Sequence, residues 1–450
     1  MKKLLLTLTI LIGIGTLASA QNSFLGIQNS PRKGMIGAVM NPAEINNLDK
    51  KIEVNFFSIS GDVGNNIISF GDILDFGGDV VDVAFNRANE RPVNMRSNIN
   101  VIGPSVGFNY GKWAFGITTQ AFGKADIVDL DPTLGQSILN IEMNSSSSQT
   151  GIASNYNQRI NANAWIELGF VLGREIFETE KHKLSAGASL KLLFPNTYTN
   201  VGLDRFNAVI LQDGTEVRLT NTNGTLNLNY PDNMVNDGIF SLKGYSFKLN
   251  QMKGVGLDLG FNYQLKDAYG RPRLNAGLAV RNLGSMTFAD GQINNTYSIN
   301  IPENEYFRLD NLGDNIDEIE QQLLDSGYFT KTSETTGIKT SLPSIVSGYA
   351  EVKLLEKLFV SAYGQFRTGD DYANEQITAQ NLIVITPRLL LGNFEIYSPW
   401  SKTDVAGYSG GLGLRYGGFF VGSNSILTGF TADTMQADFH LGLSWGFGRN

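Results

Sequence analysis

The last stretch of the chain, ADFHLGLSWGF at residues 437–447, alternates strictly between two kinds of side chain. Apolar residues occupy every second position, and small or polar residues fill the positions between them. Because successive side chains of a β-strand point to opposite faces, this period of two predicts a strand with one apolar and one polar face. In a soluble protein the apolar face would meet a core, whereas in a membrane barrel it would meet lipid.

The same alternation recurs throughout the chain. GVGLDLGFNYQL at 254–265 and RLNAGLAVRNLG at 273–284 repeat it. About fourteen such segments can be placed, and most reach the roughly 9–11 residues that a tilted strand needs to cross a bilayer. They cover residues 51–60, 98–110, 112–124, 161–174, 183–195, 251–265, 272–286, 342–355, 358–369, 380–391, 393–399, 406–416, 418–424 and 435–447. Pro387 requires a bulge or an unpaired site in its segment, because proline donates no ladder hydrogen bond.

The connections between these segments alternate in length. Short connections lie at 111, 174–182, 266–271, 356–357, 392 and 417, whereas the long ones include 61–97, 125–160, 196–250 and 287–341. Outer-membrane barrels combine short periplasmic turns with long external loops, and a soluble sandwich has no reason to sort its loops this way. We therefore predict an all-β fold: a transmembrane antiparallel β-barrel of about 14 strands, with long extracellular loops and both termini in the periplasm.

The N-terminus has the pattern of a secretory signal peptide. MKKLLLTLTILIGIGTLASAQN begins with two lysines, continues with a short apolar run and has Ala18-Ser19-Ala20 before Gln21. A transmembrane anchor is the alternative, but the run is short and lacks a stop-transfer flank. We predict a signal peptide at 1–20, cleaved near Ala20, and a mature protein in the outer membrane of a Gram-negative bacterium.

Composition excludes several classes of function. The chain has no cysteine, which rules out iron–sulfur clusters, thiolate zinc sites and cysteine nucleophiles. Its formal net charge of -8 argues against nucleic acid as a partner. Of the two histidines, His182 falls in a predicted turn and His440 in the last strand, and no G-x-S-x-G elbow accompanies them. We therefore expect no enzyme activity, no cofactor and no metal ligands.

The strand phase also predicts which charged side chains line the lumen. The alternation assigns the charged positions to the inner face, and this placement supports the phase, because charges that face lipid cost a few kcal/mol each near the bilayer midplane. The predicted lumen-lining residues are Glu53, Glu167, Lys191, Asp258, Arg281, Glu351, Lys353, Arg367 and Arg415. These charges fit either an ion-pair network that stiffens the wall or a pathway for a solute.

Two segments within the predicted loops have helical patterns. DNIDEIEQQLLDSG at 314–327 has an apolar stripe, a candidate capping box at Asn315 and Glu318, and a stop at Gly327. Its acidic face matches no EF-hand spacing, so we interpret it as a solvated helix face. FGDILDFGGDVVDVAF at 70–85 is a candidate helix over the barrel mouth, interrupted by two glycines.

The stretch RKGMIGAVMNPAEINNLDKKIEVNFFSIS at 32–60 places Asn41-Pro42-Ala43 just before the first strand. This arrangement resembles the long-chain fatty-acid transporter barrels and their secretion-associated relatives, the PorV-like proteins of the type IX system. The paired strands ending in Arg281-Asn282-Leu283-Gly284, and GGLGLRYGGFFVGSNSIL at 410–427, resemble a Bacteroidetes branch of that superfamily. The resemblance implies that residues 21–50 form a plug or hatch inside a barrel of residues 51–450, with Asn41, Pro42 and Ala43 at its gate.

The width of the predicted barrel supports the same expectation. Eight strands already leave room only for side chains or one small ligand, so a barrel of about fourteen must contain water or another segment. Residues 21–49 carry apolar side chains with no strand of their own to bury them.

Two functions remain open. The first is passive transport of a small, in one version hydrophobic, solute across the outer membrane. The second is a plugged barrel that binds or scaffolds a secretion-system or surface protein. Besides that solute or protein, outer-membrane lipid is the expected partner.

Overall fold

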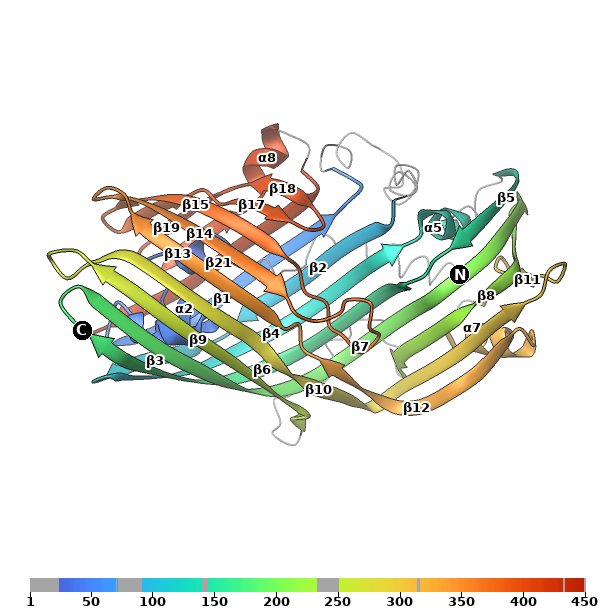
Figure 1. Ribbon diagram of the computed structural model, residues 1–450, viewed down its shortest axis with the longest axis horizontal. Helices are drawn as coiled ribbons and strands as arrows, with labels where there is room; N and C mark the ends of the chain where they lie inside the picture. Colours follow the sequence, from blue (N-terminus) through green and yellow to red (C-terminus); the bar gives the residue numbers. More distant parts are fainter. Residues whose placement is uncertain are drawn as a thin grey trace.

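The computed structural model describes residues 24–69, 71, 91–139, 145–232, 251–313, 316–431 and 434–448. The predicted signal peptide lies outside these residues, as does all of the candidate helix at 70–85 except Gly71. All strands belong to a single sheet that closes on itself, because β1 (Ile52–Asn65) pairs with β21 (Gln436–Phe447). The chain therefore folds as an antiparallel β-barrel (Figure 1).

The order of strands around the ring follows the sequence, and several strands share one position end to end. After β1 come β2 (Val93–Ile102) with β3 (Ser105–Tyr110), β4 (Trp113–Leu130), β6 (Asn157–Glu178), β7 (His182–Gly214), β8 (Glu216–Pro231) with β9 (Gly254–Lys266), and β10 (Pro272–Ile301). The ring continues with β12 (Phe329–Ser341) and β13 (Ile345–Lys353), β14 (Leu358–Arg367), β15 (Leu382–Leu391), β16 (Phe394–Tyr397) and β17 (Trp400–Thr403), β18 (Gly407–Gly410) and β19 (Leu412–Tyr416), β20 (Phe419–Ser423) and β21.

The predicted strands are confirmed. Each of the segments proposed from the alternation coincides with a strand or a split pair of strands, in the expected order. The unpaired site expected at Pro387 is also present, because β15 pairs with β17 up to Ile385 and with β16 from Arg388 onward. Short connections gather at one end of the barrel, here called the turn end, and long ones at the other, the loop end (Figure 1).

Three of the predicted long loops are wrong in part, because strands continue through them. β7 has 33 residues and β10 has 30, and both run past the barrel into the ranges predicted as loops at 196–250 and 287–341. Within the range 125–160, β4, α5 (Pro132–Leu139), β5 (Ser145–Ala153) and β6 account for most of the chain. In these parts the two faces are reversed relative to the wall strands: alternating runs such as LNLNY at 226–230 of β8 turn their apolar side chains inward to a core, whereas outward positions such as Asn221 and Asn223 are polar.

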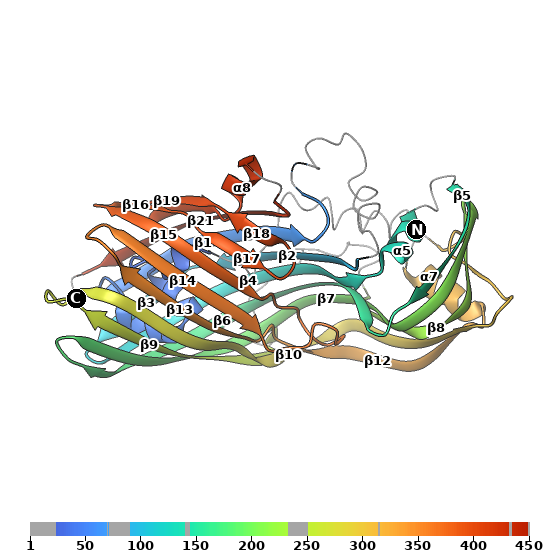
Figure 2. The same ribbon diagram turned by 45° about the horizontal axis from the view of Figure 1, so that its top comes forward.

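The continued strands form an extension at the loop end (Figures 1 and 2). It consists of β5, β8, β11 (Phe307–Arg308), β12 and the distal parts of β7 and β10. The helix predicted at 314–327 is confirmed as α7 (Ile316–Asp325), which ends before Gly327 with its φ of +75°. Leu134 of α5 and Ile319 and Leu323 of α7 join the apolar core that the extension encloses.

A belt of exposed apolar side chains surrounds the barrel near the turn end. Among its members are Phe108, Phe115, Phe170, Leu172, Leu190, Leu257, Leu259, Phe261, Leu278, Ile383, Ile385, Leu414, Val421 and Trp445. The alternate positions of the same strands point inward and are polar or glycine, such as Asp258, Gly260 and Asn262 of β9. Among the described residues, no helix has both the length and the hydropathy to cross a membrane.

The belt gives a direct test of which face meets lipid. In a bilayer, we expect Leu259→Arg to lower the free energy of unfolding by about 2–4 kcal/mol, because the guanidinium would face acyl chains. Asn223→Arg, on the outward face of the extension, serves as the control and should cost little. The free energies come from denaturant unfolding of the barrel reconstituted in liposomes. Equal losses for the two variants would contradict the assignment of the belt.

Candidate functional site

The barrel contains residues 24–50, here called the plug segment. It consists of η2 (Ile27–Asn29), α2 (Met35–Met40), η3 (Pro42–Asn47) and the turns between them, and it leads directly into β1. Residues 24–30 and most of α2 and η3 are buried although the segment forms no strand. The segment contacts wall strands on opposite sides of the ring and fills the lumen at the turn end (Figure 2).

Apolar side chains of the plug segment pack in three places on the wall. Phe24, Ile27 and Ile36 meet Ile102, Tyr397 and Phe420, with the rings of Phe24 and Phe420 edge to face at 6.3 Å. Met35, Ala38, Ile45 and Leu48 pack against Ala114 and Val171, and Leu25 packs against Tyr363, Leu382 and Val384. These contacts bury the apolar residues that the sequence left without a strand.

The Asn41-Pro42-Ala43 turn lies against glycines of three adjacent wall strands. Asn41 caps η3 by accepting a hydrogen bond from the Ala43 amide at 3.0 Å, and its own amide donates to the Phe261 carbonyl of β9 at 2.9 Å. A Cβ at Gly260 would overlap the Asn41 side chain, and one at Gly187 would overlap the backbone of Pro42 and Ala43. The glycines of the lumen face therefore make room for this turn.

Glu44 is the polar centre of the plug segment. It is 2% exposed and accepts hydrogen bonds from the amides of Asn262 and Asn275 of the wall at 3.0 Å, and from the Tyr349 hydroxyl. Lys33 of the same segment pairs with it at 3.2 Å. A buried carboxylate is stable only when charged and hydrogen-bonding partners surround it, so this cluster fixes the position of the segment.

A second polar cluster joins the plug segment to β15 and β16. Arg388, fully buried, pairs with Glu395 at 2.5 Å and with Glu351 at 3.1 Å, and it donates to the Gly26 carbonyl at 2.6 Å. Ser30 donates to Glu395 at 2.9 Å. Arg388 and Glu395 are not among the predicted lumen residues, although both occupy inward positions of the alternation in their segments.

The structure places the predicted lumen residues in several different groups. Seven are buried within the ring: Glu53, Glu167, Lys191, Asp258, Arg281, Glu351 and Arg415. Lys191 pairs with Asp258 at 2.8 Å and with Glu167 at 3.3 Å, so three of them form one ion-pair cluster. Lys353 and Arg367 are partly exposed near the two ends of the barrel, and Lys353 pairs with Glu356 at the turn end.

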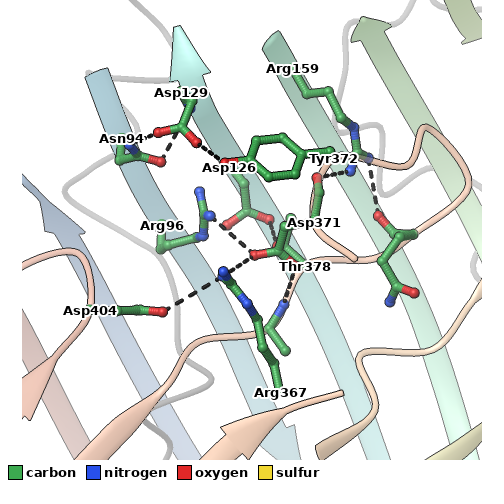
Figure 3. Close-up of polar contacts among 12 residues, drawn as sticks. Asn94, Arg96, Asp126, Asp129, Arg159, Arg367, Asp371, Tyr372, Thr378 and Asp404 are labelled. Atoms are coloured by element: carbon green, nitrogen blue, oxygen red, sulfur yellow. Dashed lines mark hydrogen bonds and ion pairs between the residues drawn. The ribbon is translucent and has the colours of Figure 1, made fainter. Parts of the chain in front are cut away.

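A second segment enters the lumen from the loop end. Residues 368–381, the connection between β14 and β15, are here called the inner loop, and they reach across to β2, β4 and β6 (Figure 3). Asp371 pairs with Arg96 of β2 at 3.2 Å and with Arg367 at 2.7 Å. Burial raises the pKa of Asp371, whereas the two arginines act in the opposite direction.

Arg159 of β6 holds the backbone of the inner loop. It is fully buried, and its guanidinium donates to the carbonyl oxygens of Asp371 at 2.6 Å and Gln376 at 3.0 Å. Thr378 donates to Asp126 of β4 (Figure 3). These contacts tie the loop to the opposite side of the ring, so the lumen is obstructed at a second level.

Apolar contacts and backbone hydrogen bonds also hold the inner loop in place. Ile377 is fully buried in a cluster that includes Trp165, Tyr198 and Leu342. Its amide donates to the Ser341 carbonyl at 3.2 Å, and the Ser341 amide donates to Glu375 at 2.8 Å. The sequence offered no local signal for the crossing of this loop to the far wall, because Thr378 and Gln376 meet Asp126 and Arg159 across 252 and 217 positions of sequence.

The two histidines each pack on a tyrosine. His440 is buried, with Nε2 2.7 Å from the Tyr397 hydroxyl, and Nδ1 of His182, at the start of β7, lies 2.7 Å from the Tyr263 hydroxyl. Within the described ranges, no group of three or more His, Asp or Glu side chains has an arrangement that could hold a metal ion.

Comparison with known families and structures gives two kinds of match. A family model described as "Family of unknown function (DUF5723)" matches residues 42–424. No curated protein matches the chain. Among solved structures, the chain is similar to the TodX deltaS2S3 mutant monoaromatic hydrocarbon channel, with 10% identity, a TM-score of 0.48 and coverage of 96% of this chain and 100% of that one.

Two further solved structures have comparable coverage. The P. putida toluene transporter TodX is 9% identical, with a TM-score of 0.45 and coverage of 93% of this chain and 95% of that one. A Pseudomonas aeruginosa FadL homologue is 10% identical, with a TM-score of 0.34 and coverage of 97% of both chains.

The seat of the Asn41 turn can be tested at Gly260. We expect Gly260→Val to displace the plug segment, because the new side chain overlaps Asn41 and overpacking costs about 1–3 kcal/mol. Trypsin cleavage after Arg32 should then become at least about fivefold faster in the folded barrel. Gly151→Val, at a position with open space around it, is the control. Unchanged cleavage in the Gly260 variant would contradict this seating.

The inner loop should respond to alkaline pH through Tyr372. The hydrogen bond that Tyr372 donates to Asp129 at 2.8 Å, together with burial, raises the pKa of Tyr372 to about 12. The neutral phenol therefore stabilises the docked loop fully below the unfolded pKa of about 10, and this contribution is lost as the pH rises through about 12. The tyrosinate absorbance of the wild type minus that of Tyr372→Phe should titrate near 12. A difference that titrates near 10 would contradict this docking.

Proposed function

This chain belongs to the DUF5723 family, and we propose that it is an outer-membrane barrel that passes a small solute through a lumen kept closed by the plug segment and the inner loop. The observation that carries the proposal is that both obstructions are separate from the wall. Neither is a strand of the ring, and each is held by side-chain contacts, joined in the inner loop by two backbone hydrogen bonds to Ser341, that can break while the ladder stays intact.

The belt supports a place in a membrane. Its apolar side chains are exposed on the outer face of strands whose inner face is polar, which is the arrangement of barrels that span bilayers. With the predicted signal peptide, this arrangement supports the outer membrane of a Gram-negative bacterium as the location.

The side chains of the lumen favour a polar solute over a hydrophobic one. Its inward positions carry amides and charged groups, among them Asn98, Asn100, Asn163, Lys124 and Arg281. A solute that crosses such a lumen must exchange its water for these groups, which favours solutes with hydrogen-bonding or charged groups of their own. The large apolar cluster lies in the extension instead, beyond the belt.

The second candidate is a plugged barrel that binds a protein partner through the extension. The observation that favours it is the extension itself, which encloses its own apolar core and is not needed to close the ring. In this case the plug segment and the inner loop would stay in the lumen permanently and stabilise the barrel.

Planar-bilayer recordings distinguish the two candidates. We expect the full chain to be closed. Deleting residues 24–40 or replacing residues 370–379 with a Gly-Ser linker should each raise conductance modestly, and the double variant should conduct steadily, because the two obstructions lie in series. Heat-dependent gel mobility checks that each barrel is folded.

A reversible lock provides the matched control. The chain has no native cysteine, so Asp126→Cys with Thr378→Cys can form one disulfide where these side chains now hydrogen-bond. In the variant without residues 24–40, the disulfide should suppress current until a reductant is added. A closed trace from a correctly folded double variant would contradict transport and leave the protein-binding candidate.

A further inference from the structure

Between the plug segment and the inner loop lies a small cavity within the ring. Its volume is about 40 Å³, which is room for a few water molecules or one small ion. Val39 and Met40 of the plug segment line one side, and residues of β2, β4, β6, β7, β10, β13 and β14, together with Pro343, line the rest.

All charged side chains that line this cavity are cations: Lys124, Lys191 and Arg281. They come from three different strands, and each is at most 8% exposed. Lys191 has carboxylate partners, since Glu167 and Asp258 lie at 3.3 and 2.8 Å. Lys124 and Arg281 have no such carboxylate partner among the described residues.

Lys124 and Arg281 contact only neutral groups. Lys124 donates to the Asn98 side chain, and Arg281 donates to the Tyr363 hydroxyl at 3.1 Å and to Gln365 at 3.2 Å. Neither lies within 4.0 Å of a carboxylate in the described part of the chain. The Arg281 Nε is buried without a hydrogen-bond partner, as is the Asn100 Oδ1 on the cavity wall.

The nearest carboxylates outside the Lys191 cluster do not line the cavity. Asp126 accepts the hydrogen bond of Thr378, and Asp371 pairs with Arg96 and Arg367. Asp126, Asp371 and Asp62 attract Lys124 from beyond ion-pair distance, but no carboxylate of the described residues lines the cavity, whose charged side chains are all cations. A buried charge without a counter-ion is costly, so a ligand of opposite sign is expected there.

We propose that this cavity binds a small anion, either an inorganic ion or the carboxylate group of an organic solute, between Lys124 and Arg281. If the barrel transports a solute as proposed above, this anion is that solute, and only this part of the proposal rests on the proposed function. Binding itself does not depend on conductance. A barrel that fails to conduct can therefore still bind the anion, and the two proposals can fail separately.

Trp165 provides the reporter, because it lines the same cavity and is 2% exposed. The other three tryptophans, Trp113, Trp400 and Trp445, are exposed on the outer face and can be replaced by phenylalanine. In this single-tryptophan protein, full length and in detergent, iodide and caesium are titrated to equilibrium as quenchers of opposite charge.

We expect iodide to quench Trp165 with saturation and caesium to have little effect. Lys124→Gln and Arg281→Gln should each weaken the iodide response about tenfold, whereas Lys112→Gln, at the turn end with its side chain 67% exposed, should leave it unchanged. Displacement of iodide by acetate assigns the site to organic carboxylates, and displacement by chloride alone assigns it to an inorganic anion. Iodide quenching that is linear, or that is equal in the Lys124 variant and in the Lys112 control, would overturn the proposal.

Discussion

The pairing of β1 with β21 is the contact on which the rest of the structure depends. It removes the free edges of the sheet and turns one face of every strand into the wall of an enclosed lumen. Polar groups on that face lose access to bulk water, so each needs a partner inside the ring. The plug segment and the inner loop supply many of these partners, as Glu44 does for Asn262 and Asn275 and as the backbone of the inner loop does for Arg159.

Glycine and asparagine residues have different roles on the lumen face. Where Gly187 and Gly260 stand, the wall has no side chain, and the backbone of the Asn41 turn reaches the strands. Where Asn262 and Asn275 stand, amides extend inward and bind Glu44. The same strands therefore carry both the space and the hydrogen bonds that seat the plug segment, while their outer faces carry the belt.

The two ends of the barrel differ in what fills them. Near the turn end, the lumen holds apolar contacts around α2 together with two buried carboxylate clusters. Near the loop end, the inner loop is fixed mainly by arginines and by its backbone. Between them remains a cavity lined by Lys124 and Arg281, two cations with no carboxylate of the described wall within 4.0 Å. This division supports a lumen with separate obstructions and a polar site between them.

The local pattern of residues was sufficient to find the wall strands and to separate their two faces. Period-two alternation is a property of neighbouring residues, so it can be recognised without knowledge of the fold, as at 254–265 and 437–447. In the extension the alternation persists, as at 226–230, but its apolar face points inward and its polar face outward, so it does not mark a strand that faces lipid. The inward charges at Glu167, Lys191 and Asp258 were found in the same way, but their meeting in one cluster was not.

Contacts across the ring were decided by tertiary structure alone. Asn41 reaches the Phe261 carbonyl across 220 positions of sequence, and Thr378 reaches Asp126 across 252. Such partners meet only after the sheet has curved and closed, and nothing in the residues around either partner specifies the other. The strands and their faces thus follow from nearest neighbours in the chain, whereas the seat of the Asn41 turn, the inner loop and the cationic cavity follow from closure of the barrel.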